Sequence, residues 1–182
     1  MLEVRDVSLA AGARPDGEPI MLLRDISAHF PRGHLCAIVG PSGSGKSTLL
    51  KVIAGIIEPE EGTVLWEGRD LSAERDLEPH EIGYVPQFGI SFDLLTVAES
   101  MDTALRLRVG GMDAEMRRRR ALEILKDAGL GEIADRRTAV LSGGQKRRLA
   151  LALEMATQPV LLLCDEVTSG LDTKSEDEIV KL

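Results

Sequence analysis

The sequence contains no hydrophobic run long enough to cross a membrane. Its longest uninterrupted apolar runs are five residues each, whereas a membrane-spanning helix needs about 20; they lie at residues 35–39, 149–153 and 160–164. Near the N-terminus, Glu3, Arg5 and Asp6 stand where a signal peptide would need an unbroken apolar stretch. We therefore expect a chain that does not itself span a membrane and that stays on the cytoplasmic side.

Cysteines and aromatic residues are scarce, and the charge balance is acidic. Cys36 and Cys164 both lie inside apolar runs, where a thiol is usually a small buried hydrophobe, so we expect two reduced core residues. The chain has 22 basic and 30 acidic side chains, a net charge of −8, which argues against sequence-independent binding to nucleic acid. With 182 residues, 43% of them hydrophobic, the chain is long enough to form a folded domain with a real core.

Glycine, proline and short charged clusters divide the chain into short elements, with no internal repeat. The continuously apolar run at 35–39 is typical of a strand buried on both faces of a parallel sheet. Apolar patterning predicts strands at residues 2–9, 26–30, 35–39, 62–66, 82–85 and 160–164. Composition and end signals predict helices at residues 46–54 and 143–156.

The middle of the chain has a helical pattern. It extends from about residue 96 to residue 129, and Leu122 and Leu125 predict one apolar stripe within it. We interpret this stretch as a helical lobe inserted in an α/β core. The four arginines at 117–120 predict a solvated helix face, with a docking surface as the alternative.

Residues 40–47, with the sequence Gly-Pro-Ser-Gly-Ser-Gly-Lys-Ser, fit the pattern G-x-x-x-x-G-K-[ST] between a predicted buried strand and a predicted helix. The glycines allow backbone N–H groups to turn around a phosphate, and the helix end adds positive potential. Lys46 then supplies a charge to the β and γ oxygens, and the Ser47 hydroxyl ligates Mg²⁺. A random chain of this length would contain the pattern in about one case in a hundred, which disfavours a chance Gly-rich turn.

Two acids, Asp165 and Glu166, directly follow the apolar run at 160–164. Kinases and GTPases share the phosphate loop, so this second site carries more information about the reaction. One carboxylate in this place can hold the hydration shell of Mg²⁺, and the other can orient or deprotonate a water molecule. A solvated turn is the alternative.

Residues 141–145, Leu-Ser-Gly-Gly-Gln, lie at the predicted start of a helix. Ser142 is a typical capping residue, and its small neighbours permit backbone N–H groups to approach an anion. One nucleotide does not easily need two such cradles from one chain. Two chains that face each other could use both.

These residues resemble the nucleotide-binding domain of ATP-binding cassette (ABC) proteins. The resemblance rests on the Walker A motif at 40–47, the Q-loop segment Tyr84-Val85-Pro86-Gln87, the signature at 141–145, the Walker B strand at 161–165 with Glu166, and the D-loop at 169–172, all in the family's order. It implies an α/β fold with a P-loop NTPase (RecA-like) core, an N-terminal antiparallel β subdomain and an inserted α-helical subdomain. It also implies a single domain over 1–182, with core and β subdomain at 1–87 and 149–182 and the helical subdomain at 88–148.

The resemblance implies an ATPase that works as a head-to-tail pair. Glu166 would be the catalytic base, and Gln87 would contact Mg²⁺ and the attacking water. The Mg²⁺ ligands would be Ser47, Gln87 and Asp165. ATP would be held by Gly40, Pro41, Ser42, Gly43, Ser44, Gly45, Lys46, Ser47 and Thr48 of one subunit and by Ser142, Gly143, Gly144 and Gln145 of the other, with Asp172 at the contact between them.

The family also implies partners. A second nucleotide-binding domain, identical or different, would complete the ATPase. ATP hydrolysis would power an integral membrane transporter subunit or domain. The helical lobe would dock on that membrane partner. The protein would then be cytoplasmic and peripheral on the inner face of the cell membrane, and no nucleic acid is expected.

The sequence departs from the family pattern in three places. The position near Ala11 lacks the aromatic residue that usually stacks on adenine, and Val167 replaces a common proline. The family's switch histidine follows the D-loop at a distance, whereas ten residues follow Asp172 and the three histidines all precede Walker B. We therefore expect a chain that is truncated at its C-terminus, binds ATP and turns it over poorly.

Two alternatives to a transporter subunit remain open at this point. One is a soluble ABC ATPase that acts on ribosomes or DNA. The separation of 54 positions between Gln87 and Leu141 provides room for a helical lobe but not for the long coiled coil of the DNA-repair members. The other is a nucleotide-binding module with little turnover.

Overall fold

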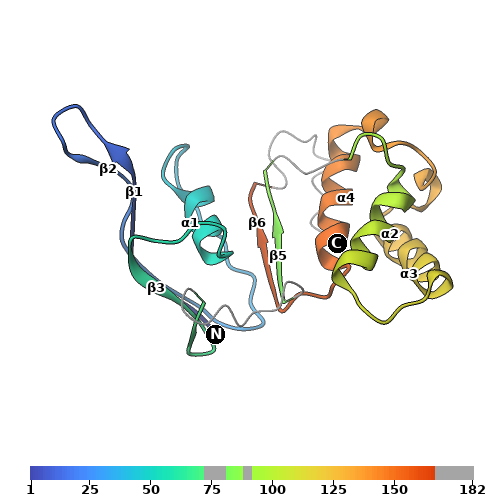
Figure 1. Cartoon of the computed structure of the whole chain (residues 1–182), viewed down its shortest axis with the longest axis horizontal. Coiled ribbons are helices and arrows are strands. Elements are labelled where there is room, and N and C mark those ends of the chain that lie inside the picture. The colour runs from blue at the N-terminus through green and yellow to red at the C-terminus, as the bar shows by residue number, and fades with distance from the viewer. Residues whose placement is uncertain (72–80, 88–91, 167–182) are drawn as a thin grey trace. The chain divides into compact units, whose positions relative to one another are not determined.

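The computed structural model describes residues 1–71, 81–87 and 92–166. Two compact units, Met1–Glu78 and Pro79–Leu182, account for the whole chain. In the described residues, the first contains an antiparallel sheet and one helix, and the second contains a parallel strand pair and a group of helices (Figure 1).

The sheet of the first unit has the strand order β2-β1-β3-β4. β1 (Leu2–Ala13) lies at its centre and pairs antiparallel with β2 (Pro19–Phe30) on one side and with β3 (Glu61–Trp66) on the other. β4 (Arg69–Asp70) pairs with β3. The predicted strands at 2–9, 26–30 and 62–66 are confirmed. The first two are longer than predicted, because the far half of β1 pairs with residues 19–23 of β2.

A bulge explains why the apolar pattern of β1 is irregular. Val4 and Val7 are both buried although they are three residues apart. In a regular strand, residues at this spacing point to opposite faces of the sheet. The pairing with β2 shifts register between them, and Asp6 adopts a left-handed φ of 50°. The extra residue returns Val7 to the buried face.

The helix of this unit, α1 (Lys46–Ile53), follows the glycine-rich loop and packs near β2. Leu49, Val52 and Ile53 are buried and form its inner face. The prediction of a helix at 46–54 is confirmed, with Ala54 as the C-terminal capping residue and a left-handed Gly55 after it.

The second unit contains two strands that run parallel, β5 (Ile82–Val85) and β6 (Leu161–Cys164). Their register pairs Ile82 with Leu161 and Val85 with Cys164. Both strands were predicted. In Figure 1 they lie side by side next to α4.

The helices of this unit begin where the sequence signals a cap. Thr96 and Ser142 each close a capping box with the residue three positions later, and Asp113 caps the helix between them. These helices are α2 (Val97–Arg108), α3 (Ala114–Asp127) and α4 (Gly143–Met155), with short 3₁₀ turns at Gly131–Ile133 and Thr138–Val140. The predicted helical stretch and the helix at 143–156 are confirmed.

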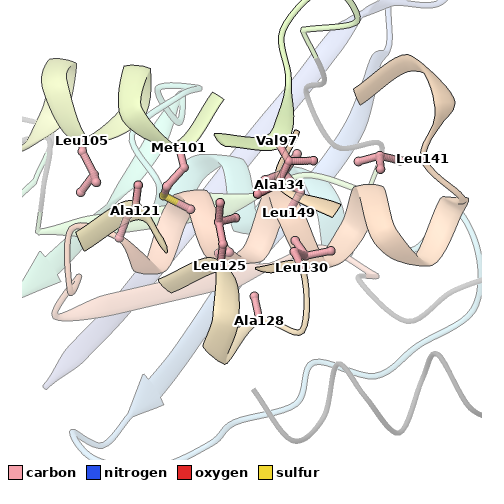
Figure 2. Packing of buried hydrophobic residues seen from close by; sticks show 12 residues of the cluster. Val97, Met101, Leu105, Ala121, Leu125, Ala128, Leu130, Ala134, Leu141 and Leu149 are labelled. Carbon is pink, nitrogen blue, oxygen red and sulfur yellow. The ribbon is translucent and has the colours of Figure 1, made fainter. Parts of the chain in front are cut away.

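The helices pack around one apolar cluster (Figure 2). On α2, Val97, Met101 and Leu105 are spaced by four residues, so they share one face, and all three are fully buried. They meet Leu125 of α3 and Leu149 of α4 in the same cluster. The close packing of these side chains stabilises the lobe mainly by removing apolar surface from water.

Three predictions are wrong. Residues 35–39 form no strand, and Leu35 and Val39 are fully exposed or nearly so, because no strand of the described sheets pairs with this run. Cys36 lies in the same run and is exposed. Cys164 is also exposed; it lies at the end of β6, which has β5 as its one strand neighbour among the described residues. Both cysteines are free thiols.

The third wrong prediction concerns the stripe on α3. Leu125 is fully buried, but Leu122 is 46% exposed. Ala121 supplies the buried position instead, because a spacing of four residues, not three, aligns with the cluster on α2.

The arginines at 117–120 do not share one environment. Arg117 is mostly buried, and its Nε donates to Asp102 Oδ1 of α2 at 3.1 Å. Arg118 and Arg119 are exposed. None of the helices in the described part of the chain combines the length and the apolar character that crossing a bilayer requires.

The packing of α3 predicts unequal costs for two leucine truncations. Leu125→Ala removes a fully buried side chain and should lower the free energy of unfolding by about 3 kcal/mol. Leu122→Ala, one turn away, should cost less than about 0.5 kcal/mol. Urea unfolding followed by circular dichroism measures both, and equal losses would contradict the assignment of the buried face.

Candidate functional site

The loop at residues 40–47 is shaped by glycines with left-handed backbone angles. Gly43 and Gly45 have φ values of 78° and 89°, which side chains other than hydrogen rarely allow. A methyl group at Gly45 would lie 2.8 Å from the backbone oxygen of Leu22, so the loop fits against β2 only with glycine there. At Gly43 the same methyl group would meet no atom within 4 Å.

Lys46 directs its charge back into this loop. Its Nζ donates to the carbonyl oxygens of Gly40 and Pro41, at 3.0 and 2.9 Å. The ammonium group therefore lies within the curve of the loop, next to the start of α1. Ser47 and Thr48 follow in the first turn of that helix.

The start of α1 suits an anion. Gly45 is its N-terminal capping residue and provides no side-chain cap, and the first turn contains no acidic residue. The N–H groups of a first helical turn have no partners inside the helix, and the helix dipole adds positive potential there. A phosphate group is therefore a suitable partner for this helix end.

In the second unit, the parallel strand pair brings two predicted site residues together. Gln87 follows β5 and Glu166 follows β6, and Gln87 Nε2 donates to Glu166 Oε2 at 2.7 Å. Glu166 has a left-handed φ of 50°, a conformation that costs a non-glycine residue free energy and that is concentrated at functional sites. The two side chains meet although 79 positions separate them in sequence.

Asp165 is buried beside this pair. Only 4% of its surface is exposed, and its backbone N–H donates to the Val85 carbonyl at 2.9 Å. Burial and the nearby charge of Asp165 raise the pKa of Tyr84. In the described residues, His, Cys, Asp and Glu side chains do not form a group of three or more that could hold a metal ion.

The signature segment forms the start of α4. Ser142 Oγ accepts from the Gln145 backbone N–H at 3.3 Å, and Gln145 Oε1 accepts from the Ser142 N–H at 3.0 Å. Ser142 and Gly143 are exposed, whereas Gly144 is buried. A methyl group at Gly143 would meet nothing within 4 Å, so this helix tip is open to another molecule.

The sequence matches the family described as "ABC transporter" over residues 23–169. The chain belongs to the ABC transporter family. The P-loop NTPase fold with its antiparallel β subdomain, expected from the resemblance, is thereby confirmed.

Relatives within the ABC family support the same assignment. The sulfate/thiosulfate import ATP-binding protein CysA of Brucella melitensis is 39% identical over 98% of this chain and 49% of its own length. The methionine import ATP-binding protein MetN 1 of Rhodopseudomonas palustris is 39% identical over 93% of this chain and 46% of its own length. The chain thus spans about half the length of these curated relatives.

A solved structure of an ABC cassette is also similar. The dimeric post-hydrolysis state of the ATP-binding cassette MJ0796, bound to ADP and Pi, superposes with a TM-score of 0.86. The two chains are 34% identical, and the match covers all of this chain and 80% of that one.

Some ABC motif residues lie outside the described part of the chain. These are Val167 and the D-loop with Asp172. The structure also reveals contacts by residues that belong to none of these motifs. Glu154 of α4 contacts both Arg108 of α2 and the backbone of Tyr84, and its sequence signal is a single charge within the apolar stretch at 149–155.

The two left-handed glycines of the ABC phosphate loop predict different costs for alanine. Gly43→Ala should destabilise the protein by about 1 kcal/mol, from backbone strain alone. Gly45→Ala adds a clash with the Leu22 carbonyl, so its cost should exceed that of Gly43→Ala by about 1 kcal/mol or more. Urea unfolding of both variants tests this. A smaller cost at Gly45 would show that the loop does not pack against β2 as described.

Proposed function

We propose that the protein binds ATP and hydrolyses it, and that it does so as the ATP-binding subunit that powers an ABC transporter. The observation that carries the proposal is the 2.7 Å contact between Gln87 and Glu166 in an ABC family member whose phosphate loop is intact. A transferable phosphoryl group needs positioning, charge neutralisation and an oriented water molecule. The phosphate loop, Gln87 and Glu166 together carry groups that could position the phosphoryl group, neutralise its charge and orient the water molecule.

The phosphate loop would bind the triphosphate. Backbone N–H groups of residues 40–48 would surround the β-phosphate, and Lys46 would leave its carbonyl partners to contact the β and γ oxygens. Because the ammonium group already lies inside the loop, little rearrangement is required.

The proposed ligands of a magnesium ion would supply oxygen donors. Hydroxyl, amide and carboxylate oxygens are the ligands that Mg²⁺ prefers, and Ser47, Gln87 and Asp165 offer one of each. When bound, the ion would neutralise charge on the phosphate oxygens. The buried Asp165 carboxylate is the strongest of these donors.

Glu166 would act as the general base. Its carboxylate accepts a proton from water while the water oxygen forms a bond to the γ-phosphorus, and the bond to the bridging oxygen breaks to release ADP. Gln87 would hold both the water and the Glu166 side chain in position. Their hydrogen bond keeps the base beside the residue that orients its substrate.

Two cassettes would act together. The tip of α4, where Ser142 and Gly143 are exposed and Gly144 is buried, would contact the γ-phosphate bound by a second cassette, while Gln145 caps the helix that presents them. We further propose that a membrane transporter subunit binds the helical region at 88–148 of this cassette, which would place the protein at the cytoplasmic face of a membrane.

Removal of the Lys46 ammonium group tests nucleotide binding. Lys46→Ala should weaken ATP binding by about thirtyfold, because a hydrogen bond to a charged group contributes about 2 kcal/mol. Lys51→Ala, at the other end of α1, is the matched control and should retain the wild-type affinity. Isothermal titration with Mg²⁺ and ATP measures both. Equal affinity for all three proteins would refute the proposed phosphate site.

Removal of the Glu166 negative charge tests turnover and dimer formation. Glu166→Gln should reduce ATP hydrolysis by about a hundredfold or more while ATP binding persists. The bound nucleotide should then hold two cassettes together, which gel filtration with ATP and Mg²⁺ would detect as a dimer. Glu132→Gln, an exposed acid in the helical region, should change neither property. A Glu166→Gln protein that remains monomeric with ATP bound would contradict the paired arrangement.

A further inference from the structure

The outer edge of β5 carries backbone groups that β6 does not satisfy. Successive residues of a strand direct their N–H and C=O groups to opposite sides. The carbonyls of Glu81 and Val85 accept hydrogen bonds from the chain of β6. The groups of Ile82 and Tyr84 therefore face away from β6, toward the ends of α2 and α4.

Two side chains occupy this edge and supply the hydrogen bonds of a neighbouring strand. Glu154 Oε2 accepts from the Tyr84 N–H at 3.2 Å, and Arg108 Nη2 donates to the Ile82 carbonyl at 3.4 Å. Arg108 Nη1 also donates to Glu154 Oε2 at 2.8 Å. The exposed fractions of the two side chains are 22% and 23%, so water competes weakly for these contacts.

Glu154 lies where a carboxylate is unfavourable unless neighbouring groups compensate. A carboxylate in the last turn of a helix opposes the helix dipole, and Glu154 lies one residue before the end of α4. Arg108 and the Tyr84 N–H offset this cost. Gly83 lies beside this contact: a methyl group there would lie 2.8 Å from Leu162 Cδ1, 3.1 Å from Pro159 Cγ and 3.4 Å from Glu154 Cβ.

We propose that Arg108 and Glu154 are positioning residues, which hold β5 in the register that brings Gln87 to Glu166. The proposal rests on the ATPase function proposed above. The connection is short: Tyr84 is bound by Glu154, the next residue accepts the Asp165 N–H at 2.9 Å, and Gln87 donates to Glu166 at 2.7 Å. The pair also ties the ends of α2 and α4 to the strand that leads to Gln87.

The variants that test this are Glu154→Leu, which removes the acceptor, Glu154→Gln, which keeps an acceptor oxygen, and Arg108→Met, which removes the donors. Arg117→Met is the matched control, because Arg117 makes a similar ion pair with Asp102 inside the helical region without touching β5. Each is made in the complete protein. The measurements are hydrogen exchange at the Tyr84 amide, and kcat and KM for ATP.

In Glu154→Leu we expect about tenfold faster exchange at the Tyr84 amide and a kcat lower by about tenfold or more, since misplacement of catalytic groups slows turnover. KM for ATP should stay within about twofold, because the phosphate loop is unchanged. Glu154→Gln should restore most of both properties. Arg108→Met should resemble Glu154→Leu, and Arg117→Met should resemble the wild type in exchange and kcat.

Wild-type exchange and kcat in both Glu154→Leu and Arg108→Met would overturn the proposal, as would an equal loss in Arg117→Met. Thermal unfolding identifies a variant that does not fold, and if Glu154→Leu fails to fold, Arg108→Met decides the outcome. A wild-type protein without ATPase activity would refute the proposed function. In that case the Tyr84 exchange rates alone decide whether the pair holds β5.

Discussion

The parallel register of β5 and β6 is the constraint on which the candidate site depends. A strand rises about 3.3 Å per residue, so a slip by one position would separate Gln87 from Glu166 by more than their 2.7 Å hydrogen bond allows. The slip would also turn every side chain of the strand to the other face. Val85 and Leu163, which are buried, resist it because their exposure would return apolar surface to water. Two four-residue strands share few backbone hydrogen bonds, so further contacts help to hold their register. Arg108 and Glu154 supply such contacts at the edge of β5 that faces away from β6.

The N-termini of α1 and α4 both contain glycine but are capped differently. α1 begins at a left-handed glycine without a side-chain cap, which leaves its first turn available to an external anion. α4 begins at Ser142 and closes a capping box with Gln145, so two of its groups are satisfied within the chain. The N-terminus of α1 is therefore suited to bind an anion, and that of α4 is a capped helix end that can contact another molecule. This difference agrees with an arrangement in which one cassette holds the nucleotide and another covers it.

Local signals predicted much of the fold, whereas features that depend on distant partners were not predictable. The helical pattern at 96–129 and the capping residue Ser142 located the helices of the second unit closely, because a helix is determined by neighbours in sequence. The run at 35–39 was misassigned because an apolar strand also needs a partner, and composition does not supply one. The site motifs named Gln87 and Glu166, but only the strand register showed that they touch. Arg108 and Glu154 are 46 positions apart, and neither belongs to a recognisable motif.

The distribution of acidic residues reconciles a net charge of −8 with a polyanionic ligand. Charges separated by more than about 8 Å are largely screened at physiological ionic strength, so the local environment of a helix end matters more than the total. α2 and α3 carry Glu99 and Glu115 in their first turns, as helices commonly do. Backbone and side-chain hydrogen bonds with Thr96 lower the pKa of Glu99, which keeps it ionised and satisfied by its own helix. α1 and α4 have no acidic residue in the first turn. The two helix starts that would face phosphate are thus the ones from which negative charge is absent, although acids are in excess elsewhere.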